Sequence, residues 1–219
     1  MKTWILLIAA LLVAACGGEP VDPPTPDVDT IRATQHGPII GFTAENGAHV
    51  WRGVPFAAST AGENRWRAPK PPQGWSETRE ALQFAERCAQ LTNMYDAGEG
   101  LKPGRAVGSE DCLAVNIFAP PDAEGADLPV MVWIHGGGNV WGRSGDYDGS
   151  RLAQNENVII VAVQYRLGPF GWFAHEALRE SAADPRDAAA SFAVLDLIAS
   201  LEWVRDNITA FGGDADNVT

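Results

Sequence analysis

Three consecutive glycines, Gly136-Gly137-Gly138, follow His135 and the apolar stretch PVMVWI at 129–134. Glycine has no Cβ, so such residues adopt positive φ and let the backbone approach a ligand closely. Peptide N–H groups left free in such a turn can converge on one oxygen, as an oxyanion requires, and loss of one such donor costs on the order of 3 kcal/mol in the barrier. A bare triple glycine is more often a flexible turn, but its place after an apolar strand favours an anion-stabilising loop.

The elements that would position this loop are predicted to be alternating strands and helices. LAVNIF (113–118) is typical of a strand, and PVMVWI (129–134) and NVIIVAVQ (157–164) predict strands buried on both faces. A short helical stretch at 150–154 separates the last two. The order strand–loop–helix–strand predicts a βαβ unit in a parallel sheet, and therefore the α/β fold class.

A longer helix is predicted over 187–208, between Pro185 and Gly212-Gly213. Its expected apolar face recurs every three or four residues and consists of Phe192, Leu195, Ile198, Leu201, Val204 and Ile208. Nearer the N-terminus, Asn46-Gly47 between two β-prone runs predicts a hairpin.

The composition bounds the class of protein. The chain has 219 residues, of which 46% are hydrophobic, enough for one ordinary domain. Its 16 basic and 28 acidic residues give a net charge of −12. This charge argues against a nucleic acid partner, whose phosphates need a basic surface, and against electrostatic adsorption to anionic lipid. No group of His, Cys or Asp has the spacing of metal ligands, and no cofactor is implied.

The first segment has the pattern of an export signal. Residues 1–16 (MKTWILLIAALLVAAC) combine a basic start with an apolar stretch too short to span a membrane. The ending resembles a bacterial lipobox, which would make Cys16 the lipidated first residue of the mature chain; a plain secreted protein is the alternative. Residues 17–30 are rich in proline and acidic side chains and predict a solvated linker before a domain at 31–219. We therefore expect a protein of the bacterial cell envelope that is held at the membrane through Cys16.

Two further cysteines, Cys88 and Cys112, remain after Cys16. An exported chain meets an oxidising compartment, in which such a pair tends to form a disulfide. The closed loop of about 25 residues would stabilise the fold by on the order of 3 kcal/mol in the chain-entropy model. The alternative is a pair of buried free thiols.

From about Thr30 to Thr219 the chain resembles the type-B carboxylesterase family. The resemblance rests on an ordered set of motifs rather than on any one of them. They are WRGVPFA (51–57), RW (65–66), EDCLAVNI (110–117), HGGG (135–138), YRLGPFG (165–171) and FGGD (211–214).

The resemblance implies the N-terminal part of an α/β-hydrolase fold, with a sheet that stops before the strand leading to the nucleophile. It implies that Gly137 and Gly138 are the two oxyanion donors of the loop and that Cys88 and Cys112 form the family's N-terminal disulfide. It also implies an ion pair between Arg65 and Glu110; the alternative is an ordinary surface arginine. Breaking such a pair would strongly destabilise the protein if it were buried.

The residues that complete the chemistry are not in this sequence. No serine lies in a G-x-S-x-G pattern, and the nearest match, GRSGD at 142–146, lacks the final glycine. By the resemblance, the nucleophilic serine falls about five residues past Thr219, and the acid and histidine follow later. The chain is thus expected to be the first part of a longer serine esterase, unstable and inactive when isolated.

Two other functions stay open. One is a non-catalytic binding protein similar to the cholinesterase-like adhesion proteins, and the other is an inactive, truncated gene product. The sequence also departs from the family pattern. Asn139 replaces an aromatic residue, Asp196-Leu197 replaces Asp-Gln, and no tryptophan lies between Cys88 and Cys112. A small neutral carboxylic ester is therefore the expected substrate rather than a choline ester.

Overall fold

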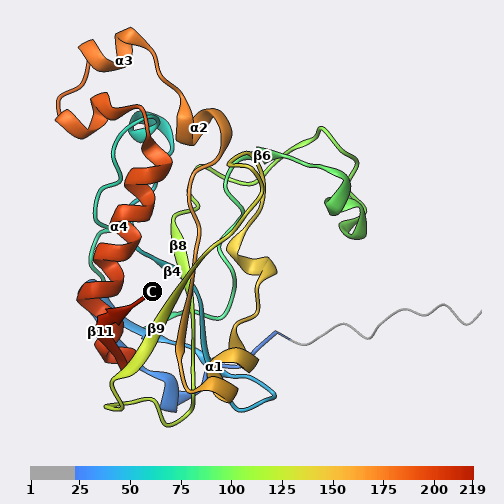
Figure 1. Cartoon of the computed structure of the whole chain (residues 1–219), viewed down its shortest axis with the longest axis vertical. Coiled ribbons are helices and arrows are strands. Elements are labelled where there is room, and N and C mark those ends of the chain that lie inside the picture. The colour runs from blue at the N-terminus through green and yellow to red at the C-terminus, as the bar shows by residue number, and fades with distance from the viewer. Residues whose placement is uncertain (1–22) are drawn as a thin grey trace, which may run out of the picture.

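The computed structural model describes residues 23–219, so the predicted signal with Cys16 and the start of the linker lie outside the described residues. A six-stranded sheet in the order β11-β9-β10-β8-β4-β3 forms the centre (Figure 1). Its strands are β3 (Phe42–Thr43), β4 (His49–Pro55), β8 (Ala114–Ala119), β9 (Leu128–Ile134), β10 (Ile159–Val163) and β11 (Gly213–Val218).

Smaller elements surround this sheet. One additional sheet contains β1 (Arg32–Thr34), β2 (Gly37–Ile40) and β5 (Arg79–Glu80), and another contains β6 (Gln90–Leu91) and β7 (Ala106–Val107). The helices are α1 (Ser150–Glu156), α2 (Gly168–Trp172), α3 (Glu176–Glu180) and α4 (Phe192–Asn207). Short 3₁₀ turns are η1 (Val28–Thr30), η2 (Gly62–Asn64), η3 (Met94–Glu99), η4 (Ser144–Asp146), η5 (Pro185–Ala189) and η6 (Ile208–Phe211). No helix in the described part of the chain is long and apolar enough to span a membrane.

The predicted βαβ unit is present, in a mixed rather than a wholly parallel sheet. β9 and β10 pair in parallel and flank α1 in the sequence, whereas β10 and β8 pair antiparallel. The predicted hairpin joins β3 to β4, and the Ala44 N–H donates to the Ala48 carbonyl across the turn. Gly47 has a φ of +87°, which explains the glycine in that turn.

Helices cover both faces of the sheet. Alternate residues of a strand point to opposite faces. Ile117 and Val161 pack in the same cluster as Val204 of α4, whereas Phe118 and Ile160 pack with Ala153 of α1. All five residues of β10 are buried, because this strand has a neighbour on each side and a helix layer over each face.

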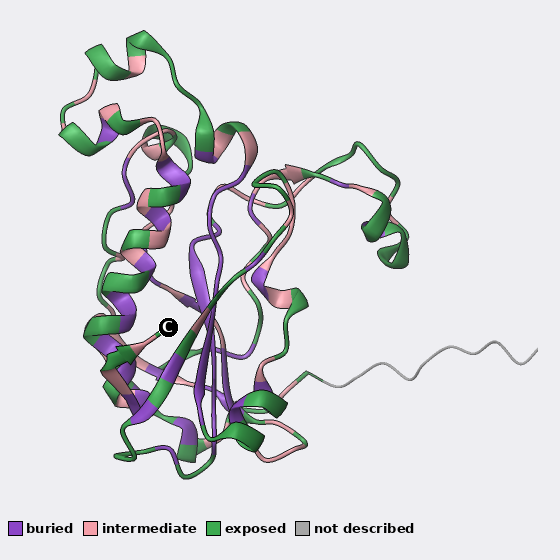
Figure 2. Cartoon of the chain, viewed as in Figure 1, coloured by how far each residue is buried: buried purple, intermediate pink, exposed green. Residues whose placement is uncertain are grey.

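The expectation that β9 is buried on both faces is wrong. Met131, Trp133 and Ile134 are 39–45% exposed, and the C-terminal half of the strand is visibly open in Figure 2. The difference has two causes. Met131 and Trp133 share one face of the strand, and neither packs in the clusters that contain α4 or α1. Ile134 lies past the pairing with β11. β11 meets β9 opposite Leu128 and Val130, and the Val132 N–H donates to the Thr219 carbonyl (2.7 Å). The rest of β9 extends past this pairing.

The predicted long helix is divided, and its apolar face is only partly as expected. Residues Pro185–Ala189 form the separate turn η5, and Ala190 has a φ of +54°, which ends the turn before α4 begins. Ile198 and Leu201 are exposed. The helix instead buries a polar stripe, because Asp196 is drawn toward Arg166.

The ion pair between Arg166 and Asp196 fastens α4 to the segment that follows β10. Asp196 Oδ1 accepts from Arg166 Nη2 (2.7 Å), and Oδ2 accepts from Nε (2.8 Å) and from the Arg166 backbone N–H (3.0 Å). The two side chains are only 3% and 0% exposed. Removing one member of a buried pair leaves an uncompensated charge in the interior, which is strongly destabilising.

We predict that Asp196→Ala lowers the free energy of unfolding by about 3–5 kcal/mol. The measurement is urea denaturation, with Asp206→Ala as the matched control. Asp206 is on the same helix but pairs with an exposed arginine, Arg205, so its loss should change stability little. Equal losses in the two variants would contradict the prediction.

Candidate active site: the loop after β9

The glycine loop begins where β9 ends, and its first residue is held firmly. The Tyr165 hydroxyl donates to the His135 carbonyl (2.7 Å), and the Tyr165 ring stacks on the His135 ring with centroids 4.5 Å apart. His135 Nδ1 lies 2.9 Å from the Gly136 carbonyl, which it can reach as a donor. The side chain thus shapes the turn, and His135 is 2% exposed.

The glycines have conformations and contacts that other residues would disturb. Gly137 has a φ of +116° and Gly138 a φ of +62°. A Cβ on Gly137 would lie 1.8 Å from the Trp141 carbonyl oxygen, so no side chain fits there. A Cβ on Gly138 would meet nothing within 4 Å, so this residue faces open space.

In the loop, the carbonyls of Gly137 and Asn139 are paired, whereas the amides of the three glycines have no partner among the described residues. The Gly137 carbonyl accepts from the N–H groups of Val140 (3.2 Å) and Trp141 (3.3 Å), and the Asn139 carbonyl accepts from Gly168 (2.7 Å). Within residues 23–219, the N–H groups of Gly136, Gly137 and Gly138 donate to no acceptor. Successive free amides in a turn form a concave site that favours an anion. The oxyanion role of Gly137 and Gly138 stays a prediction, which these free amides support.

An apolar cavity of about 740 Å³ adjoins this loop. Val140 and Trp141 of the loop form one wall, and no lining residue carries a charge. Other apolar walls are Leu91, Val107, Pro169 and Phe170. A cavity of this chemistry accommodates an uncharged, apolar group beside the free amides.

The loop between Cys88 and Cys112 lies on the other side of this cavity. The two cysteines form a disulfide with Cα atoms 5.1 Å apart, as predicted. The segment between them projects from the body on the side away from α4 (Figure 1). Tyr95 stacks on Trp141, with ring centroids 5.1 Å apart. The disulfide loop and the glycine loop are therefore in direct contact.

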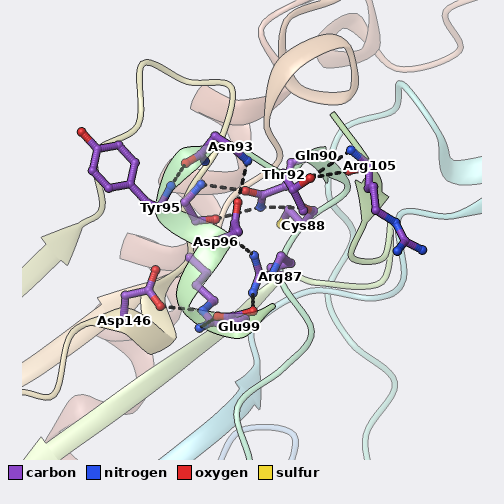
Figure 3. Close-up of polar contacts among 12 residues, drawn as sticks. Arg87, Cys88, Gln90, Thr92, Asn93, Tyr95, Asp96, Glu99, Arg105 and Asp146 are labelled. Atoms are coloured by element: carbon purple, nitrogen blue, oxygen red, sulfur yellow. Dashed lines mark hydrogen bonds and ion pairs between the residues drawn. The ribbon is translucent and has the colours of Figure 1, made fainter. Parts of the chain in front are cut away.

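Ion pairs strengthen this contact. Arg87 lies between two carboxylates, Asp96 and Glu99, at 2.6 Å from each (Figure 3). Glu99 also pairs with Arg143 (2.5 Å), which follows the glycine loop. These ion pairs could not be predicted from the sequence, because the spacing of the residues along the chain gives no sign that Glu99 is shared between two arginines.

The predicted ion pair between Arg65 and Glu110 is present but is not buried. Arg65 Nε donates to Glu110 Oε2 (2.6 Å), and a second bond joins Nη2 to Oε1. The Arg65 side chain is 43% exposed and Glu110 17% exposed. Water therefore screens the interaction, and a strong contribution to stability is not expected.

Ser144 is a structural residue. Its hydroxyl accepts from Asn116 Nδ2 (2.9 Å), its N–H donates to Gln164 Oε1 (2.8 Å), and it is 5% exposed. These bonds agree with its exclusion as a nucleophile. Within the described residues, no three His, Cys, Asp or Glu side chains are grouped so that they could hold a metal ion.

Comparisons with known proteins identify a family that this chain matches. The model of the Carboxylesterase family matches residues 28–219. Para-nitrobenzyl esterase of Bacillus subtilis is 44% identical over 86% of the chain, and fumonisin B1 esterase of Sphingopyxis macrogoltabida is 39% identical over 99%. The chain spans 37% of the length of each of these two relatives.

Solved structures show the same fold. A thermophilic PNB esterase superposes with a TM-score of 0.75 at 42% identity, over 87% of this chain and 38% of its own. A carboxylesterase of Geobacillus stearothermophilus gives 0.73 at 36% identity, over 86% and 37%. Both have the α/β-hydrolase fold, so the predicted fold class is confirmed.

The buried His135 ring predicts a pH-dependent stability. Burial lowers the pKa of His135 below its usual 6.5, and the nearby Gly136 carbonyl opposes this only in part. A depressed folded-state pKa adds stability that is present above the unfolded pKa and is lost as the pH falls below it. We therefore expect the free energy of unfolding to decrease between about pH 8 and about pH 5.5, a range in which histidines titrate.

Urea denaturation at both pH values of wild type and of His135→Asn measures this effect, and the variant should lose less stability over the interval. Burial also lowers the pKa of His49, so the variant keeps part of the dependence. Identical losses in the two proteins would show that His135 is not responsible.

Proposed function

The chain belongs to the carboxylesterase family, and we propose that it is the first part of a serine-dependent carboxylic ester hydrolase. In this proposal Gly137 and Gly138 donate the oxyanion hydrogen bonds. The observation that carries it is the set of free amides at the end of β9, in a loop whose Val140 and Trp141 line an uncharged apolar cavity. The nucleophile, acid and base would be contributed by residues beyond Thr219.

The proposed reaction has two acyl-transfer steps. A serine hydroxyl attacks the ester carbonyl while a base takes its proton, and the carbonyl oxygen becomes a tetrahedral oxyanion. The amides of the glycine loop stabilise this negative charge and need little reorganisation, since the Tyr165 bond and the Gly137 carbonyl bonds hold the turn in place. As the oxyanion collapses, the ester C–O bond breaks and the base gives its proton to the leaving alcohol oxygen. Water then hydrolyses the acyl-serine by the same route and regenerates the serine hydroxyl.

The cavity points to the class of substrate. Its lining is mostly apolar and carries no charged side chain, which favours an ester with a neutral, apolar group. The relative from Bacillus subtilis is named for a para-nitrobenzyl ester. The para-nitrobenzyl group is uncharged and largely apolar. We therefore propose a small neutral carboxylic ester as substrate.

The location of the protein is a separate proposal that rests on residues outside the described part of the chain. The lipobox pattern that ends at Cys16 supports export followed by lipid attachment. Membrane fractionation tests it: Cys16→Ser should release the protein from the membrane fraction.

A non-catalytic binding protein on the same fold is the alternative. The unpaired amides favour the enzyme, because binding alone needs no oxyanion site. The coding sequence after Thr219 distinguishes the two. A serine in G-x-S-x-G supports the hydrolase, and a substituted serine supports the binding protein.

We predict that Gly137→Ala in the full-length protein lowers kcat for a p-nitrophenyl ester by roughly 10²–10³-fold, the loss expected from one oxyanion donor. The new Cβ would displace the loop, because it would lie 1.8 Å from the Trp141 carbonyl oxygen. Gly125→Ala is the matched control. Gly125 has a φ of +73° and open space around its Cβ position, and we expect its kcat to be unchanged. An unchanged kcat in Gly137→Ala would refute the assigned role.

A further inference from the structure

The Gln90 side chain forms two hydrogen bonds with the backbone of Gly142, at the end of the glycine loop. Its side-chain Oε1 accepts from the Gly142 N–H (2.8 Å), and its Nε2 donates to the Gly142 carbonyl (2.9 Å). One amide side chain therefore satisfies both backbone groups of one residue. The same Nε2 also donates to the Cys88 carbonyl (2.9 Å), next to the disulfide (Figure 3).

Gly142 closes the glycine loop on itself. It has a φ of +119°, and a Cβ placed on it would lie 2.7 Å from both the Gly136 carbonyl oxygen and His135 Nδ1. The last residue of the loop thus packs directly on its first residues. A displacement of Gly142 would be transmitted to Gly136 and to the amides that follow it.

The backbone that carries Gln90 is itself fixed. Gln90 lies on β6, where it pairs with Val107 of β7, and Cys88 forms a β-bridge with Ser109. The disulfide lies two residues before Gln90. The side chain therefore reaches the loop from a rigid support, as a positioning group requires.

We propose that Gln90 is a positioning residue that holds the amides of Gly137 and Gly138 in their productive orientation through Gly142. The loop is then fixed at both ends, by Tyr165 at its start and by Gln90 at its end. This inference rests on the proposed function, because it assigns the two glycines the oxyanion role.

The competing explanation is that Gln90 only helps to hold the disulfide loop against the glycine loop. A variant at Glu99 distinguishes this explanation from the proposed role. Glu99 also joins the disulfide loop to the segment after Gly142, through its pair with Arg143, but it makes no contact with Gly142 itself. Glu99→Gln therefore weakens the docking of the loops and leaves the Gln90 contact in place. It is the matched control.

The test uses the full-length protein and the isosteric variant Gln90→Glu. The new carboxylate can still accept from the Gly142 N–H, but its second oxygen would face the carbonyls of Gly142 and Cys88 with no hydrogen to donate. We expect kcat for a p-nitrophenyl ester to fall about 10–100-fold with KM changed by less than about 3-fold, since small misplacements of catalytic groups have effects of this size. Glu99→Gln should keep kcat within about 3-fold of wild type, because Glu99 makes no contact with Gly142.

The pH dependence of kcat distinguishes this positioning role from a purely structural one. Protonation of the new carboxyl group restores one donor, so the ratio of variant to wild-type kcat should rise as the pH falls from about 8 to about 5.5. A flat ratio, an unchanged kcat in Gln90→Glu, or an equal loss in Glu99→Gln would overturn the inference.

Amide hydrogen exchange keeps this test separate from the proposed function. A wild-type protein without esterase activity contradicts the proposed function, whereas the contact of Gln90 is measured without any substrate. In Gln90→Ala the Gly142 amide should exchange faster than in wild type and in Glu99→Gln. Unchanged exchange overturns the inference whether or not the protein is active.

Discussion

The hydrogen bond from the Tyr165 hydroxyl to the His135 carbonyl fixes the point at which β9 becomes the glycine loop. The bond joins neighbouring parallel strands, because Tyr165 follows β10 and His135 follows β9. Beyond it the chain turns through positive φ values. The carbonyls of Gly137 and Asn139 accept hydrogen bonds, whereas the amides of the three glycines donate none within the described residues. The candidate site depends on this division between satisfied acceptors and free donors.

Residues far apart in the sequence meet at this loop and serve different purposes. The disulfide of Cys88 and Cys112 holds a segment from which Gln90 reaches Gly142 and Tyr95 reaches Trp141. These contacts are polar or aromatic, and they surround a cavity whose lining is mostly apolar. The segment between Cys88 and Cys112 therefore both holds the glycine loop in place and lines the cavity that can take an apolar group.

The features that could be predicted from the sequence are those with local causes. The hairpin at Gly47, the strand β10 and the glycine loop follow from turn chemistry and apolar runs. The disulfide follows from the predicted export signal and the count of cysteines. The exposure of β9 and the orientation of α4 could not be predicted locally, because they depend on where β11 pairs and on the contact between Asp196 and Arg166. In the same way, nothing near Gln90 in the sequence indicates that it reaches Gly142.

The open half of β9 has a consequence for how these residues behave in solution. Trp133 and Ile134 are exposed and form a short apolar ribbon past the point where Thr219 pairs with Val132. A ribbon of this kind is a template on which a strand from another molecule can add, because hydrogen-bonding groups and apolar side chains are presented together. A strand paired at this margin would cover the backbone groups and the two apolar side chains together.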